Sequence, residues 1–158
     1  QLRLDAHDED MLLAIHLDAA QAELEWLADL RVCPQTLAMV LDAWPDKITV
    51  PVRPVTIAAI TYAAANGATV TLPEADYVAR ARHGFMRIRP AAGTSWPTLA
   101  PDGQITITLS AGFAEDHPNL AISRAAILVK TASLFENREG AGCLAFDTLV
   151  NQLAARWV

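Results

Sequence analysis

The sequence predicts an α+β fold, in which a small antiparallel β-sheet packs on two main helices and a third, amphipathic helix follows on a tether. Three observations predict it. Apolar residues recur at helical spacing near both ends of the chain, they alternate with polar residues through its middle, and turn-forming residues punctuate that middle. The 158 residues are most simply one domain. We divide them into a main domain, residues 1–140, and a flexible joint with the last helix, residues 141–158.

The first helix is predicted to run from about Asp8 to Leu30, because acidic residues at its start suit the positive end of the helix dipole. Apolar residues three and four positions apart define the face that we expect to be buried: Leu12, Ile15, Ala19, Ala22 and Trp26. The opposite face carries Asp18, Gln21 and Glu25. We expect this second face to be solvated; an acidic wall facing a channel is the alternative.

The middle of the chain changes to the period of β-strands. Asn66-Gly67 predicts a type I′ hairpin turn, which needs positive φ at both central residues. The apolar parity changes between Ile57 and Ile60, and a bulge near Ala58-Ala59 would reconcile the two halves of that strand. Strands are predicted over residues 36–41, 48–50, 55–62, 69–72, 77–82, 85–89 and 105–110.

A concentrated basic patch lies in the predicted hairpin that turns at His83-Gly84. Its members are Arg80, Arg82, Arg87 and Arg89. Such a patch can contact an acidic partner surface or a phosphate backbone, and the alternative is an ordinary solvated strand face. The loop that follows, residues 90–102, is long for a hairpin link, and we expect Trp96 to anchor it in its own core.

The second main helix is predicted over Pro118 to Glu139, with Asp116 as N-cap and Gly140 as the stop. After the joint, the last helix carries an apolar stripe at i, i+3, i+4, i+7 and i+11: Phe146, Leu149, Val150, Leu153 and Trp157. This stripe either folds back on its own domain or docks in a groove of another protein.

Composition and motifs exclude several classes of function. The net charge of -6 argues against a general nucleic-acid-binding surface. Cys33 and Cys143 lack the spacing of a metal or redox pair, and His7 and His16 do not share a helix face one turn apart. We find no catalytic or phosphate-binding motif, so we expect no catalytic residue, no metal and no cofactor. Charges interrupt every long apolar run, so we expect no membrane span. Since Gln1 is no initiator, we expect sequence before it.

The run from Gly103 to Glu139, a strand, an Ala-Gly-aromatic break, a proline-started helix and a closing Glu-Asn-Arg-Glu, resembles the head-tail connector (adaptor) family of long-tailed phages and phage-derived gene transfer agents. Further blocks in the same order extend this resemblance over most of the chain. They are Pro34-Gln35-Thr36, Leu41-Asp42-Ala43-Trp44-Pro45, Arg53-Pro54-Val55, Leu72-Pro73, Asp76-Tyr77 and Ser95-Trp96-Pro97.

The resemblance implies a structural protein in the neck of a particle, made in the bacterial cytoplasm, and not an enzyme. Residues 1–140 would be the adaptor domain. Copies would form a twelvefold ring beneath the portal protein, and DNA would pass through the ring's channel without specific binding. Because the family attaches to the portal through its C-terminal segment, the resemblance favours docking of the stripe at Phe146, Leu149, Val150, Leu153 and Trp157.

The arginine patch would then face a tail-side stopper or tail terminator. Two alternatives stay open. One is a small ligand-binding domain or enzyme without a recognisable motif, and the other is a stopper or completion protein on the tail side of the neck.

Overall fold

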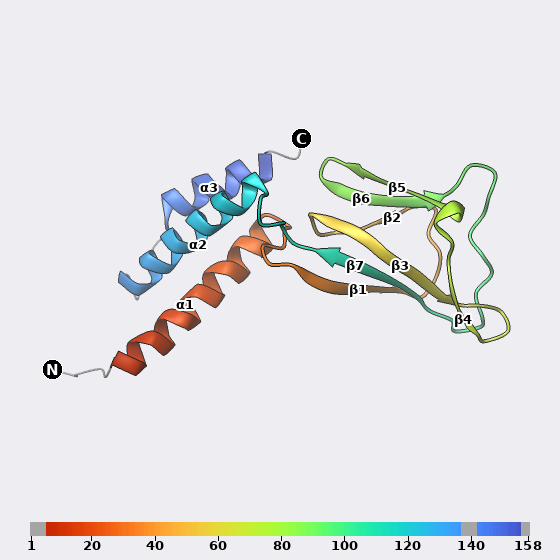
Figure 1. The fold of residues 1–158 in the computed structure, drawn as a ribbon, viewed down its shortest axis with the longest axis horizontal. Helices are drawn as coiled ribbons and strands as arrows, with labels where there is room; N and C mark the ends of the chain where they lie inside the picture. The colour runs from red at the N-terminus through yellow and green to blue at the C-terminus, as the bar shows by residue number, and fades with distance from the viewer. Residues whose placement is uncertain (1–5, 137–141, 156–158) are drawn as a thin grey trace. The chain divides into compact units, whose positions relative to one another are not determined.

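The computed structural model describes residues 6–136 and 142–155 and divides them into two compact units. The helical unit falls within residues 1–32 and 113–158, and the β unit comprises residues 33–112. Helices α1 (Ala6–Leu27), α2 (Pro118–Glu136) and α3 (Leu144–Ala155) make up the first (Figure 1). The α+β class is confirmed. The described strands, however, form two sheets instead of one, and each unit buries a hydrophobic core of its own.

The core of the helical unit draws on all three helices. Leu24 of α1, Ala126 of α2, and Phe146 and Leu153 of α3 are fully buried in one cluster, to which Phe113 adds its ring. The last helix therefore packs on its own domain through Phe146, Val150 and Leu153, which is the fold-back arrangement that the sequence left open. An apolar stripe on a short helix can be buried in the core of its own domain or in a groove of another protein, so the sequence alone could not decide between these two arrangements.

The buried face of α1 differs from the prediction. Ala20, Leu24 and Ala28 point into the core at four-residue spacing, whereas Ile15 and Trp26 are exposed. The predicted apolar face was wrong because α1 carries apolar residues on two opposite sides, and periodicity does not tell which side the other helices cover.

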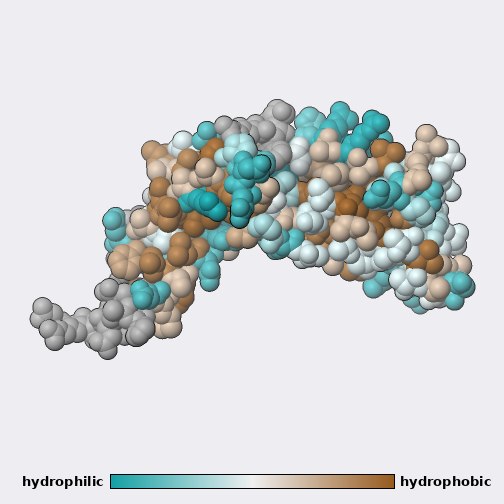
Figure 2. Space-filling view, viewed as in Figure 1, coloured by the Kyte–Doolittle hydropathy of each residue, from teal (hydrophilic) through white to brown (hydrophobic). Residues whose placement is uncertain are grey.

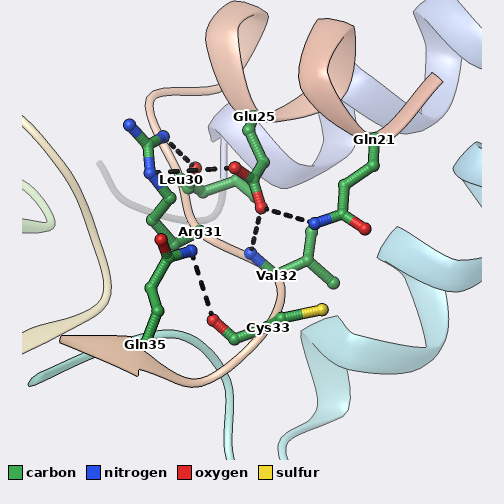
Figure 3. A network of polar contacts seen from close by, with 7 residues as sticks. All are labelled: Gln21, Glu25, Leu30, Arg31, Val32, Cys33 and Gln35. Carbon is green, nitrogen blue, oxygen red and sulfur yellow. Dashed lines mark hydrogen bonds and ion pairs between the residues drawn. The ribbon is translucent and has the colours of Figure 1, made fainter. Parts of the chain in front are cut away.

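Glu25 closes the C-terminal end of α1 and does not belong to a solvated face (Figure 3). Its Oε1 accepts hydrogen bonds from the Val32 amide at 2.9 Å and from Gln21 Nε2 at 3.1 Å, and Arg31 Nε lies 3.7 Å from Oε2. Asp29 has φ of 50°, and the Leu30 amide reaches back to the Glu25 carbonyl at 3.1 Å. This is the Schellman arrangement of a helix end, with aspartate in the left-handed position that glycine usually takes.

The start of α2 at Pro118 agrees with the prediction, but its cap does not. The Asn119 amide donates to Nδ1 of His117 at 3.1 Å, so His117, and not Asp116, supplies the side-chain cap. The His117 ring lies against Phe113, with 4.6 Å between the centroids. The predicted end of this helix at Glu139 and its stop at Gly140 lie outside the described residues.

The β unit contains two antiparallel sheets. One has the strand order β1-β7-β3-β4, from β1 (Gln35–Leu41), β7 (Ile105–Ala111), β3 (Val55–Ala63) and β4 (Thr69–Thr71). The other has the order β2-β6-β5, from β2 (Ile48–Thr49), β6 (Phe85–Pro90) and β5 (Tyr77–Arg82), and a 3₁₀ turn, η1 (Glu74–Asp76), precedes β5. The predicted strands therefore exist, each within a few residues of its expected bounds.

Strand β7 is central because both of its neighbours pair with it along almost its whole length. Its alternation buries Ile105, Ile107 and Leu109, which join Ile48 and Ile88 of the other sheet in one core cluster. The predicted bulge is confirmed: the register of β3 against β7 shifts between Ile57 and Ala59. One apolar face of each sheet is thus buried.

The type I′ turn that was predicted at Asn66-Gly67 is found instead at the other hairpin, His83-Gly84, for which no type was predicted. Between β3 and β4 only Gly67 has positive φ, and its amide bonds to the Ala64 carbonyl at 2.7 Å, so this turn is a longer loop than type I′. The Asn66 side chain contributes by accepting from the Ala68 amide at 3.0 Å. At the other hairpin, His83 and Gly84 have φ of 51° and 78°, which is the type I′ signature.

Trp96 anchors the long loop, as predicted. Its ring stacks on Trp44 with 4.5 Å between centroids, and its Nε1 donates to the Pro45 carbonyl at 2.8 Å. Trp44 in turn meets the edge of Tyr62. The loop is therefore tied to the core of the β unit.

We expect Phe146→Ala to lower the free energy of unfolding of the helical unit by about 3–5 kcal/mol, because the ring is fully buried and its loss leaves a cavity. Leu144→Ala is the matched control on the same helix, since Leu144 is 82% exposed, and should change stability by less than about 0.5 kcal/mol. Urea unfolding followed by circular dichroism measures both. Equal effects would contradict the packing of α3.

Gly112→Ala should destabilise the β unit by roughly 2 kcal/mol or more, because Gly112 has φ of 109° and an added Cβ would overlap the carbonyl of Cys33. Gly142→Ala, which meets no atom within 4 Å, serves as the control and should stay within about 0.5 kcal/mol of the parent. The midpoints of urea unfolding test this pair. A neutral Gly112→Ala would contradict the close approach.

Candidate functional site

The arginine patch forms one face of the β5–β6 hairpin. The two-residue turn at His83-Gly84 fixes the register, which sets Arg80 directly opposite Arg87 and Val78 opposite Arg89. Side chains of directly opposed residues project to the same side of a sheet. Arg80, Arg82, Arg87 and Arg89 therefore all lie on one side, which we call the arginine face.

The other side of the hairpin explains why the arginines point outward. Ile88 is fully buried in the core of the β unit, and Tyr77 and Met86 pack against that core. Because successive side chains in a strand alternate between its two faces, burying Ile88 directs Arg87 and Arg89 away from the core. Hydrophilic side chains accordingly gather over β5 and β6 in the space-filling view (Figure 2).

The arginine face is a shallow hollow with unneutralised positive charge. The hollow has a volume of about 380 Å³ and is lined by Val78, Arg80, Ala81, Arg82, Arg87, Arg89 and Pro90. Within residues 6–136 and 142–155, no carboxylate forms an ion pair with any of the four arginines. Like charges directly opposite each other on a sheet are destabilising. A surface of this kind suits an anionic ligand, which would relieve the repulsion.

Arg87 differs from the other three arginines of this face in having a buried, unpartnered donor within the described residues. Its Nε is buried and has no hydrogen-bond partner in the described part of the protein. A buried donor without a partner costs about 1–3 kcal/mol. An acceptor brought by a partner near Arg87 would recover part of this energy.

A fifth arginine lies close to the arginine face. The guanidinium of Arg53 stacks over the ring of Phe85 with 4.9 Å between Cζ and the ring centroid, and Phe85 pairs with Arg82 across the hairpin. Sequence reasoning missed Arg53, because no local pattern connects it to residue 85. It also missed Phe85 and Val78 as members of this face, although the register from the His83-Gly84 turn could have placed both.

Tyr77 begins β5 on the side opposite the arginines. Burial, and to a smaller extent the negative charge of Glu74, raises the pKa of the Tyr77 hydroxyl above its ordinary value. The phenol therefore stays neutral at physiological pH and contributes no charge of its own to the hairpin.

The second set of predicted site residues lies on α3. Phe146, Val150 and Leu153 are buried in the core of the helical unit, and Leu149 packs partly buried against it. Trp157 lies outside the described residues. Contact of this stripe with a portal protein stays a prediction, and through the three buried residues it would require α3 to leave its own core.

The described residues contain no group of three or more histidine, cysteine, aspartate or glutamate side chains that could hold a metal ion. In the same part of the chain no helix is both long and apolar enough to cross a membrane. The surface that is best defined for contact with a ligand is therefore the arginine face.

Arg80→Gln should weaken retention on an immobilised polyanion such as heparin while leaving the free energy of unfolding equal or up to about 0.5 kcal/mol higher, because it removes a like-charge pair. Arg124→Gln is the control, with the same change in charge at an exposed position of α2. The salt concentration at elution and urea unfolding are the measurements. Equal elution shifts for the two variants would contradict a localised site.

Comparisons with known proteins identify relatives among solved structures. No protein-family model and no curated protein sequence matches the chain. A chain in the neck of an empty gene transfer agent particle, determined with C6 symmetry, matches with a TM-score of 0.74 and 26% identity, covering 99% of this chain and 82% of that one. A chain in the neck of a native particle, determined with C12 symmetry, matches with a TM-score of 0.72 and 26% identity over 94% of this chain and 84% of that one.

A third match, from the virion of a native gene transfer agent particle, has a TM-score of 0.73 and 27% identity and covers 99% of this chain and 83% of that one. The resemblance seen in the sequence and the similarity of the folds agree. Over almost its whole length the chain is therefore similar to neck and virion chains of gene transfer agent particles, which supports a head-tail connector-type family.

Proposed function

We propose that the chain is a structural neck protein, an adaptor subunit whose copies form a ring that binds the portal and extends the DNA channel towards the tail. The observation that carries this proposal is the match over 99% of the chain to a subunit of a gene transfer agent neck. The similar neck chains come from assemblies with sixfold and twelvefold symmetry. A twelvefold ring is compatible with both, since twelvefold symmetry contains sixfold symmetry.

In such a ring each copy needs a lateral interface with its neighbours, and a head-to-tail interface closes into a ring by rotation. The net charge of -6 suits a channel through which DNA slides, because acidic side chains repel phosphates. DNA would then pass without specific binding.

The tail side of the ring is assigned to the arginine face. Arg80, Arg82 and Arg89 are exposed, and Arg87 is partly exposed, so an acidic surface of a stopper or tail terminator can reach them. Charge complementarity of this kind steers association and suppresses wrong partners. The absence of ion pairs for these four arginines in the described residues supports this assignment over a purely structural role.

The portal side is assigned to the C-terminal segment that includes α3. Phe146, Val150 and Leu153 hold α3 on its own core, so we place the contact on what remains of the segment: exposed Leu144, partly buried Leu149, and Trp157 from the sequence stripe. This replaces the view that the whole stripe docks on the portal. It also means that removing the segment would damage the helical unit itself.

Trp157→Ala should abolish capture of the portal protein while leaving the helical unit folded. The test is a pull-down from cells that produce particles, with the full chain and the variant as baits and mass spectrometry to identify a large ring-forming portal protein. Val40→Ala, a change to an exposed apolar residue of β1, is the control and should keep the capture. Circular dichroism verifies the fold of each bait.

Capture by the parent and by Val40→Ala alone supports portal attachment through the C-terminal segment. Equal capture by all three baits would move the contact elsewhere on the chain. Capture by none of them, from a lysate shown to contain assembled heads, would contradict the adaptor role.

A further inference from the structure

Helix α1 carries a second apolar stripe on the side opposite its buried face. Trp26 lies two residues from both Leu24 and Ala28, which places it about 160° around the helix from each of them. The stripe is exposed: Trp26 by 77%, Met11 by 63% and Ile15 by 56%. We call it the outer stripe of α1, and it consists of Met11, Ile15, Ala19, Ala22 and Trp26.

Helix α2 also carries an exposed apolar stripe on the side opposite its buried face. Leu128 lies two residues beyond buried Ala126 and is 63% exposed, and Phe135 is 46% exposed. These two residues continue a row of exposed alanines on the same side of the helix. The outer stripe of α2 consists of Ala121, Ala125, Leu128, Ala132 and Phe135. Contiguous apolar surface of this kind is rare on monomers and marks an interaction site.

The two outer stripes have the same first three steps when they are read in opposite directions, and their last steps differ by one residue. From Trp26 back along α1 the steps are four, three, four and four residues, and from Ala121 forward along α2 they are four, three, four and three. Alternating steps of three and four are the repeat with which helices pack side by side. An antiparallel alignment therefore keeps the first four positions of the two stripes in register and offsets the last pair, Met11 and Phe135, by one residue.

This alignment also sets large side chains against small ones. Trp26 faces Ala121, Leu128 faces Ala19, and Ile15 faces Ala132. Ala22 meets Ala125 at the closest approach, and Met11 meets Phe135 at the far end. Large residues opposite alanines let side chains interdigitate without voids or overlap.

Within one chain the outer stripes cannot meet, because α1 and α2 already pack on each other through their opposite faces around Leu24 and Ala126. A second copy of the chain supplies the complementary stripe. We propose that the outer stripe of α1 in one copy packs antiparallel on the outer stripe of α2 in the next. Each copy then offers one stripe to either neighbour, a head-to-tail contact that can close into a ring. This inference rests on the proposed ring-forming function and names its lateral interface.

The test is a disulfide cross-link between Ala22→Cys and Ala125→Cys in one chain, with Cys33 and Cys143 replaced by serine. Both alanines are exposed, so the changes are small and do not touch the core. Purified particles and the concentrated purified chain are each oxidised with copper phenanthroline and analysed by non-reducing electrophoresis. We expect a ladder of cross-linked copies in the particles.

Two variants serve as controls for the cross-linking experiment. Ala22→Cys alone should give no cross-link; dimers from it would indicate that α1 pairs with α1, which overturns the proposal. Ala14→Cys with Ala125→Cys places an exposed thiol on α1 about 100° away from the middle of the outer stripe, and it should give no ladder.

Failure of the interface and failure of the function give different results. Particles that contain the Ala22→Cys/Ala125→Cys chain but show no ladder overturn the interface and leave the adaptor role intact. If particles lack even the parent chain, the adaptor role fails, and the purified chain decides about the interface. Cross-linked oligomers of it would support the outer stripes, and monomers alone would overturn them.

Discussion

The structure depends on one constraint, which is that a helix or strand can bury only one face within a subunit of this size. Where the opposite face is also apolar, the subunit exposes surface that water solvates poorly, and where it carries like charges, these repel one another. The outer stripes of α1 and α2 and the arginine face of β5–β6 are the three such surfaces described above. Each of these surfaces is exposed because the opposite face of the same helix or hairpin is buried in a core.

In the β unit, the sequence was sufficient to predict which face of a regularly alternating strand is buried. Strict alternation at Ile105, Ile107 and Leu109 specified the buried face of β7, and the change of parity within β3 specified the bulge. The arginines were correctly placed on a hairpin that turns at His83-Gly84. The turn at Asn66-Gly67 was predicted as a hairpin but with the wrong type, because the Asn66 side chain and the Ala64 carbonyl stabilise a longer loop.

In the helical unit, the sequence placed the helices but not their buried faces. Ala20 and Leu24 are no more hydrophobic than Ile15 and Trp26, so only the packing of α2 shows which side of α1 lies inside. The role of Glu25 in closing α1 depends on an amide seven residues away and leaves no local signal. For α3, an amphipathic stripe is equally suited to a core and to a partner's groove, and the structure places its middle in the core.

The central claim, that copies of this chain form a ring in the particle neck, is tested most directly by reconstructing that neck by electron cryo-microscopy from cells with and without the gene for this chain. We expect that loss of the chain removes one layer of density between portal and tail and leaves heads without attached tails. A neck unchanged in its layers, on particles that still carry tails, would contradict it.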